Sequence, residues 1–283
     1  MSLTSFLANP EVRERFKSEF IAPSLGCKRE IRAPLLSPNY KLVGIAFDYL
    51  LRFHVKLLNP KSKSRDWIAE EAAMMIAEID DCPISPQEIV ANAKMVYREY
   101  LHTGKIDDKL LRAVLCLAKL DPIRRDPRYF LFVAEDAYFK TLGDIDPKDI
   151  LDLRQLISLV HPEAFTTNRE SSLNPIFGRA SKLVGGADCD LVIDDLIVEI
   201  KTVQKFELKR EYFNQLIGYY LLSRIDGISG MPKNHQINRL GIYFSRHGYL
   251  WIFKVDDVIN KEKLPEFIRW FKQQAIISFP PKA

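Results

Sequence analysis

The stretch GGADCDLVIDDLIVEIK, residues 185–201, decides the fold of this chain. Two short apolar runs, Leu191–Ile193 and Leu196–Val198, flank the polar pair Asp194-Asp195. β-Branched runs on either side of a polar break predict a β-hairpin. Asp-Asp is a poorer tight-turn pair than Asn-Gly, and a three-residue loop would break the register unless a bulge restored it. The pairing of residues across this hairpin therefore depends on the length of its turn.

A two-residue turn places polar groups of the two strands opposite one another. Asp190 then lies opposite Glu199, and Asp188 lies opposite Lys201. Side chains alternate faces along a strand, so all four project from one face of the hairpin. Directly opposed Cβ atoms lie roughly 4.5–5.5 Å apart. The sequence thus predicts a compact group of three carboxylates and one ammonium.

Opposed carboxylates on an apolar hairpin indicate a bound cation. Like charges directly opposite each other destabilise a sheet, and close carboxylates do not both ionise cheaply. A divalent ion removes that penalty, and hard oxygen ligands suit Mg²⁺ or Mn²⁺. Such an ion activates water and stabilises charge on a phosphate, beside the fixed charge of Lys201. The alternative is a solvated hairpin face on which Lys201 only neutralises Asp188.

An aspartate followed by Glu199-x-Lys201 on the next strand resembles the signature of the PD-(D/E)XK nucleases. The following helix carries Gln215-x-x-x-Tyr219, which is similar to an additional motif of the RecB-like branch, and i,i+4 spacing puts both side chains on one face. The resemblance implies a metal-dependent nuclease with Asp190, Glu199, Lys201, Gln215 and Tyr219 as catalytic residues. It also implies an α/β fold, with a restriction-endonuclease-like mixed sheet flanked by helices.

RecB-like enzymes also carry an upstream Gly-x-x-x-His whose histidine contributes to the metal site. This chain has Gly44-Ile-Ala-Phe-Asp48, with aspartate where histidine is expected. Aspartate is itself a good ligand for Mg²⁺ or Mn²⁺. A surface Asp48–Arg52 ion pair at i,i+4 is the competing interpretation. The implied metal ligands are Asp190 and Glu199, with Asp188 and Asp48 as further candidates. The Gly185-x-x-Asp188 spacing favours Asp188 as the family aspartate, whereas opposition to Glu199 favours Asp190.

Two regions are predicted. Residues 1–160 form a mainly helical region that contributes one helix, about residues 43–58, to the site, and residues 161–283 form the nuclease core. Residues 161–182 are expected to be a polar connection into the sheet. A second hairpin is predicted from residues 239–244 and 249–255. The predicted helices cover residues 11–21, 43–58, 67–79, 85–101, 107–120, 129–142, 147–160, 207–224 and 261–276.

Composition is that of an ordinary globular chain. It has 283 residues, of which 47% are hydrophobic and 28% charged, with a net charge of +4. A local basic cluster follows the hairpin and could hold phosphates; it comprises Lys201, Lys205, Lys209 and Arg210. No apolar run approaches the ~20 residues of a membrane span, and the start of the chain lacks a secretion signal. A cytoplasmic location is expected.

The four cysteines are scattered, and none follows Cys189. Some RecB-like nucleases hold an iron–sulfur cluster through a C-terminal group of cysteines, so no such cluster is expected here. Free cysteine is among the most buried residue types. Cys189 is therefore predicted to point into the core.

The function expected from the sequence is Mg²⁺- or Mn²⁺-dependent hydrolysis of phosphodiester bonds in DNA, in repair, recombination or defence. Two alternatives use the same fold. The chain could be a nucleic-acid-binding protein without turnover, or a subunit of a larger helicase–nuclease complex that docks through its helical N-terminal region.

Overall fold

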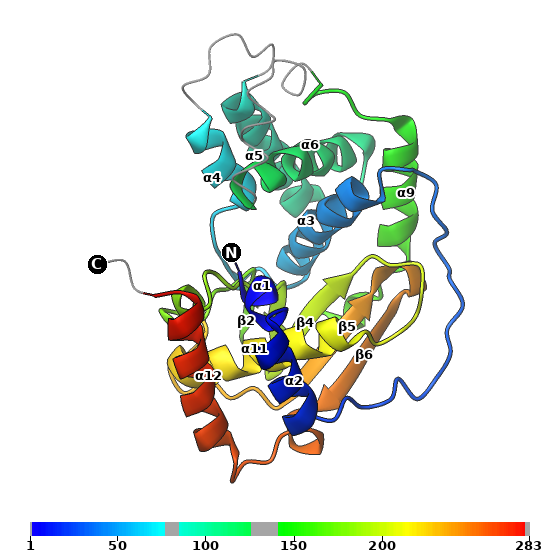
Figure 1. Ribbon diagram of the computed structural model, residues 1–283. Coiled ribbons are helices and arrows are strands. Elements are labelled where there is room, and N and C mark those ends of the chain that lie inside the picture. Colours follow the sequence, from blue (N-terminus) through cyan, green and yellow to red (C-terminus); the bar gives the residue numbers. More distant parts are fainter. Residues whose placement is uncertain (1, 77–84, 126–140, 281–283) are drawn as a thin grey trace.

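Alternating apolar residues on the strands build a sheet that carries helices on both faces (Figure 1). The computed structural model describes residues 2–76, 85–125 and 141–280. The protein is an α/β protein with a helical N-terminal half followed by a six-stranded mixed sheet with interspersed helices, as the sequence predicts in outline. None of the helices in these ranges combines the length and apolar character that a membrane span requires.

The elements follow one another in a simple order. The helices before residue 160 are α1 (Leu3–Leu7), α2 (Pro10–Glu19), α3 (Tyr40–Leu58), α4 (Ile68–Met75), α5 (Pro86–Thr103), α6 (Asp108–Arg125) and α9 (Pro147–Ser158). The later helices are α10 (Ala180–Leu183), α11 (Arg210–Asp226) and α12 (Leu264–Ser278). The strands are β1 (Lys63–Ser64), β2 (Ser171–Leu173), β3 (Leu191–Ile193), β4 (Leu196–Lys201), β5 (Arg239–Phe244) and β6 (Tyr249–Lys254), in spatial order β1 to β6. The pairs β1–β2 and β4–β5 are parallel and the other three are antiparallel.

The β3–β4 hairpin has the predicted register. Ile193 pairs with Leu196 and Leu191 with Val198, which leaves a two-residue turn at Asp194-Asp195. Asp194 adopts a φ of 50°, a left-handed conformation that aspartate tolerates better than most residues. Neighbouring side chains hold this weak turn: the Thr167 hydroxyl donates to Asp194 at 2.5 Å, and Arg239 Nε donates to Asp195 at 2.9 Å.

Strand β4 contributes side chains to two separate cores. Val198 and Ile200 pack into the core shared with α3, α5, α6 and α9, whereas Ile197 packs into the core shared with α11 and α12. Alternation then places Glu199 and Lys201 on the α11 side of the strand. Cys189 is fully buried in the second core, as predicted.

The first twenty residues pack with the sheet rather than with the other N-terminal helices. Leu3 and Phe16 belong to the core beneath α11 and α12, and Figure 1 shows α1 and α2 lying across α11. Arg210, predicted as part of a basic cluster, turns toward this packing: its Nη2 donates to the carbonyl oxygens of Phe16 and Phe20 at 2.7 and 2.8 Å. Arg210 therefore fastens the end of α2 to the start of α11.

Most predicted elements are present, with shifted ends. The helices predicted from residues 11, 43, 67, 85, 107, 147, 207 and 261 correspond to α2, α3, α4, α5, α6, α9, α11 and α12, and the second hairpin corresponds to β5 and β6. The helix predicted at 129–142 lies almost wholly outside the described residues. The stretch 161–182, expected to be a connection only, contains β2 and part of α10. Short elements such as β1, β2 and α1 escape pattern analysis because they are too short to show a period.

A buried ion pair joins the helical half to the sheet half. Arg246 follows β5, and its guanidinium donates to both carboxylate oxygens of Asp152 on α9 at 2.8 and 2.9 Å. Both side chains are completely buried. The same guanidinium donates to the carbonyl of Ala33, so it also holds the long connection between α2 and α3.

Replacement of Asp152 by alanine should destabilise the protein by about 3–5 kcal/mol, because it leaves the Arg246 charge buried without a partner. The matched control is Asp256→Ala, which removes an exposed ion pair with Lys261 and should change stability little. Urea unfolding followed by circular dichroism gives both values. Equal effects of the two substitutions would contradict the structure.

Candidate metal and phosphate site

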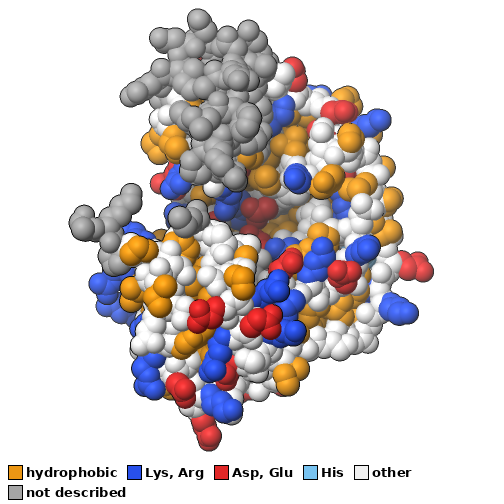
Figure 2. Space-filling model, in the orientation of Figure 1, with side chains coloured by type: hydrophobic (Ala, Val, Ile, Leu, Met, Phe, Trp, Pro, Cys, Tyr) orange, Lys and Arg blue, Asp and Glu red, His pale blue; other side chains and the backbone are white. Residues whose placement is uncertain are grey.

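The residues singled out in the sequence line one cavity of about 630 Å³, between α3 and α6 on one side and α11 on the other. Figure 2 shows a hollow between the helical half and the sheet half, with acidic side chains at its base and Lys and Arg side chains nearby. The seven candidate residues in the lining are Asp48, Asp188, Asp190, Glu199, Lys201, Gln215 and Tyr219.

Asp190 and Glu199 meet as the hairpin register predicts. The register of β3 and β4, continued one step beyond Leu191, places Asp190 opposite Glu199. The backbone N–H of Ile200 donates to Asp190 Oδ2 at 2.6 Å, which fixes this carboxylate beside β4. Burial, followed by the negative charges of Glu199 and Asp48, raises the pKa of Asp190 well above its ordinary value. Burial and the neighbouring carboxylates therefore both disfavour the ionised form of Asp190.

Lys201 connects the acidic pair to α11. Its Nζ donates to Glu199 Oε1 at 2.7 Å and to Gln215 Oε1 at 3.1 Å, and Gln215 Nε2 donates to the Tyr219 hydroxyl at 2.7 Å. Nζ also lies 4.7 Å from the centre of the Tyr212 ring. Burial alone would lower the pKa of Lys201, but the adjacent Glu199 carboxylate raises it. The i,i+4 pair on α11 thus positions the ammonium group.

Asp48 combines features of both interpretations offered for it. Its Oδ2 forms the i,i+4 ion pair with Arg52 at 2.5 Å, but the pair is not on the surface, because only 6% of the Arg52 side chain is exposed. The other oxygen, Oδ1, is buried and has no hydrogen-bond partner among the described residues. Burial raises the pKa of Asp48 even though Arg52 opposes the change. Asp48 therefore keeps one unpartnered oxygen at the cavity.

The predicted opposition of Asp188 and Lys201 lies beyond the end of the β3–β4 ladder and stays a prediction. The β3–β4 ladder ends at Leu191, and on the β2 side of the chain Asp188 forms an isolated bridge with Ile176. The Asp188 carboxylate accepts a hydrogen bond from Arg125 Nη2 at 3.3 Å. Both Asp188 and Asp190 line the cavity. Of the two aspartates, Asp190 is the one placed beside Glu199.

Sequence reasoning missed Arg125 and Asp121 at the end of α6. Arg125 Nε donates to Asp121 at 2.5 Å, and both residues line the cavity with Asp188. In sequence they resemble any i,i+4 ion pair on a helix surface. Their proximity to Asp188 depends on the docking of α6 against the sheet half, which leaves no signal in a single sequence.

The cavity offers the oxygen ligands that a hard divalent cation prefers, although the described residues are not close enough together to coordinate one as they stand. Glu199 Oε2 and Asp48 Oδ1 are buried oxygens without partners in the described part of the chain. No three His, Cys, Asp or Glu side chains of the described residues are close enough together to hold a metal as they stand. Mg²⁺ usually takes one or two carboxylates and keeps several waters, so Asp190 and Glu199 suffice for such a site.

No protein-family model matches the chain, and neither a curated protein nor a solved structure shows significant similarity to it. The assignment of this cavity therefore rests on the arrangement of its own residues.

A divalent cation should stabilise the wild-type protein through Asp190. Asp190→Asn removes one of two neighbouring carboxylates but keeps an oxygen for the Ile200 N–H. In the presence of a chelator this variant should therefore melt a few degrees higher than the wild type. Added Mn²⁺ should stabilise only the wild type, by about 2.7 kcal/mol when free metal is about 100 times the dissociation constant.

Differential scanning calorimetry measures both effects, and Asp257→Asn, at an exposed position, is the matched control that should keep the metal response. Equal stabilisation of wild type and Asp190→Asn by Mn²⁺ would exclude Asp190 as a ligand.

Proposed function

We propose that the protein is a Mg²⁺- or Mn²⁺-dependent nuclease that hydrolyses phosphodiester bonds in DNA, on a PD-(D/E)XK core of the RecB-like branch. The observation that carries this proposal is the arrangement of Asp190, Glu199 and Lys201 around one cavity, with an uncompensated buried oxygen on Glu199. A phosphate-transfer site needs this combination of metal-binding oxygens and one fixed cation.

Asp190 and Glu199 would hold the ion, with Asp48 as a further candidate. When bound, the ion activates water and withdraws charge from the phosphate. Asp188 is a weaker candidate, because its carboxylate is engaged by Arg125.

The side chain of Lys201 supplies fixed positive charge. The ammonium group donates hydrogen bonds to Glu199 Oε1 and to Gln215 Oε1. The bond to Gln215 keeps the ammonium group directed into the cavity. A phosphate that enters the cavity exchanges for one of these acceptors. Tyr219, whose hydroxyl receives the Gln215 N–H, keeps the amide in the orientation that Lys201 requires.

The energetic scale of the reaction shows how the roles divide. Enzymatic phosphodiester hydrolysis requires a reduction of the barrier on the order of 20 kcal/mol. A single well-placed donor such as Lys201 contributes about 3–4 kcal/mol. Most of the remainder has to come from metal activation of water and from positioning of the reacting groups.

Purified protein should cleave labelled DNA in the presence of Mg²⁺ or Mn²⁺, and a chelator should abolish cleavage. Lys201→Ala and Glu199→Gln should each lower the single-turnover rate by roughly 10²–10³. The matched controls Lys254→Ala and Glu266→Gln change exposed residues away from the cavity and should retain full activity. If the two site variants fold normally and cleave as fast as the controls, the proposed mechanism is wrong.

Two other roles use the same surfaces. A binding protein without turnover would retain affinity for DNA and show no metal-dependent cleavage under any condition. A subunit of a larger complex would become active only when a partner docks on the helical half. Assays with and without cell extract depleted of endogenous nuclease distinguish these roles from an enzyme that is active alone.

A further inference from the structure

A second cavity of about 570 Å³ adjoins the metal-site cavity. The two are adjacent, because they share lining residues from three parts of the chain: the N-terminal segment, the end of α6 and the loop before β3. The shared residues are Ser2, Arg125, Gly186, Ala187 and Asp188. A group held in the second cavity therefore lies next to whatever occupies the first.

Cations predominate in this second cavity, which we call the basic cavity. Its lining contains four cationic side chains, those of Arg65, Arg124, Arg125 and Lys182, and two carboxylates, those of Glu71 and Asp188. The metal-site cavity has the opposite balance, with five carboxylates and three cations in its lining. Negative charge is thus concentrated where a metal would lie, and positive charge immediately beside it.

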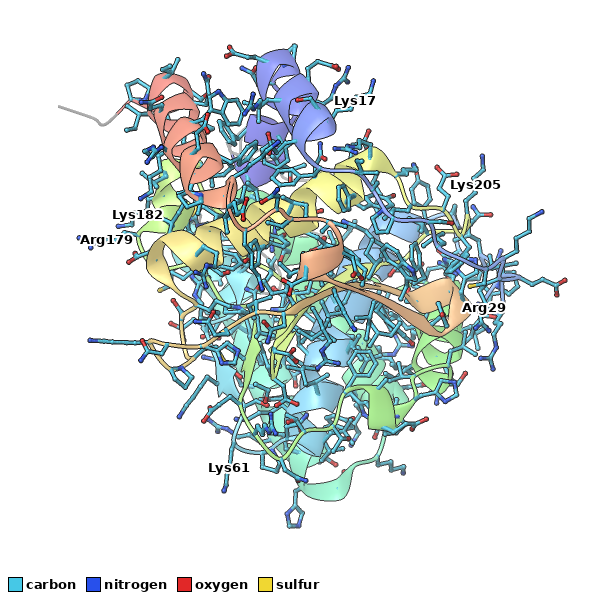
Figure 3. The ribbon with its side chains drawn as sticks, turned by 90° about the horizontal axis from the view of Figure 1, so that it is seen from below. Lys17, Arg29, Lys61, Arg179, Lys182 and Lys205 are labelled. Carbon is cyan, nitrogen blue, oxygen red and sulfur yellow. The ribbon has the colours of Figure 1, made fainter. Side chains whose placement is uncertain are left out.

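The carboxylates hold the arginine side chains without neutralising all of their charge. The Glu71 carboxylate forms ion pairs with two arginines, with Arg124 Nε at 2.8 Å and with Arg65 Nη2 at 3.7 Å. About half of the Arg124 side chain and a third of the Arg65 side chain remain exposed. Lys182 is exposed and has no salt-bridge partner among the described residues, and Figure 3 shows it at the molecular edge beside Arg179. These groups are oriented and still accessible to a ligand.

The other side of the metal-site cavity differs in charge. A cavity of about 1010 Å³ that shares Tyr40, Lys41 and Ile45 with it is lined by Lys41 and Lys119 but also by Asp144, Asp146 and Asp149. This cavity has more acids than bases, so it does not attract a polyanion. The metal-site cavity therefore has an excess of positive charge on one side and an excess of negative charge on the other.

We propose that the basic cavity binds the phosphodiester backbone of the substrate strand immediately to one side of the scissile phosphate. This inference rests on the proposed nuclease function. Guanidinium groups match phosphate oxygens in geometry and charge, and several of them in one cavity can hold successive phosphates. The strand would run from the metal-site cavity past Arg125 toward Lys182.

The test is the salt dependence of DNA binding by the full chain in the presence of a chelator. The test variant carries Arg65→Ala, Arg124→Ala and Lys182→Ala, and the matched control carries Lys61→Ala, Lys254→Ala and Lys272→Ala. Both variants have three fewer positive charges than the wild type, but the control residues are exposed outside both cavities, and Figure 3 shows Lys61 far from Lys182. Fluorescence anisotropy with a fluorescein-labelled oligodeoxynucleotide, single-stranded and duplex, gives the affinities.

The test variant should bind at least tenfold more weakly than the control. The slope of log K against log salt should flatten by about 0.7–0.9 for each phosphate that the variant no longer neutralises. The single variant Lys182→Glu, at an exposed position, should weaken binding in the same direction and guards against misfolding of the triple variant.

The outcomes separate the two proposals. Equal affinity and slope for the test variant and its control would overturn the basic-cavity proposal, even if the wild type cleaves DNA. Failure of the wild type to bind either oligonucleotide would also overturn it. If binding depends on the three cations but no metal supports cleavage, the basic cavity is supported and the nuclease proposal fails.

Discussion

The opposition of Asp190 and Glu199 across the end of the β3–β4 hairpin is the constraint on which the candidate site depends. Backbone pairing, not attraction, brings these two carboxylates together, because the Ile193–Leu196 pairing and the two-residue turn fix the register. Thr167 and Arg239 hold the turn residues, and the Ile200 N–H holds Asp190. The sheet therefore imposes a charge arrangement that is unfavourable by itself, and burial together with the charges of Glu199 and Asp48 raises the pKa of Asp190. A cation at this place would relieve it.

The remaining groups of the site come from helices packed against opposite faces of the sheet. Alternation along β4 directs Glu199 and Lys201 to the α11 side, where Gln215 and Tyr219 continue the hydrogen bonds from Lys201. Asp48 reaches the same cavity from α3, which packs on the other face. The cavity thus forms at the end of β4, between residues of the two helical layers. The buried Arg246–Asp152 pair links one of these layers to the sheet.

The charges that line the two adjoining cavities differ, and this difference would favour one direction for a bound nucleic-acid strand. Carboxylates collect in the metal-site cavity, whereas arginines and a lysine collect in the basic cavity next to it. Arg125 lies between them and contacts carboxylates of both α6 and the loop before β3. Under the proposed function, the basic cavity would attract a polyanion, and a bound cation would offset the acidic charge next to it. In that case metal binding and strand binding would support each other.

The sequence by itself determined the β3–β4 register, the long helices, the second hairpin, the opposition of Asp190 and Glu199 and the shared helix face of Gln215 and Tyr219. All of these follow from periods of two or 3.6 residues, which act over short distances along the chain. Only the tertiary structure decided that Asp188 contacts Arg125, that Arg210 turns away from the basic cluster, and that Asp48 has one paired and one unpaired oxygen. It also decided that residues 3–20 pack beneath α11 and that a basic cavity adjoins the site. These features depend on how layers dock, and docking is set by the summed packing of many side chains rather than by any local spacing.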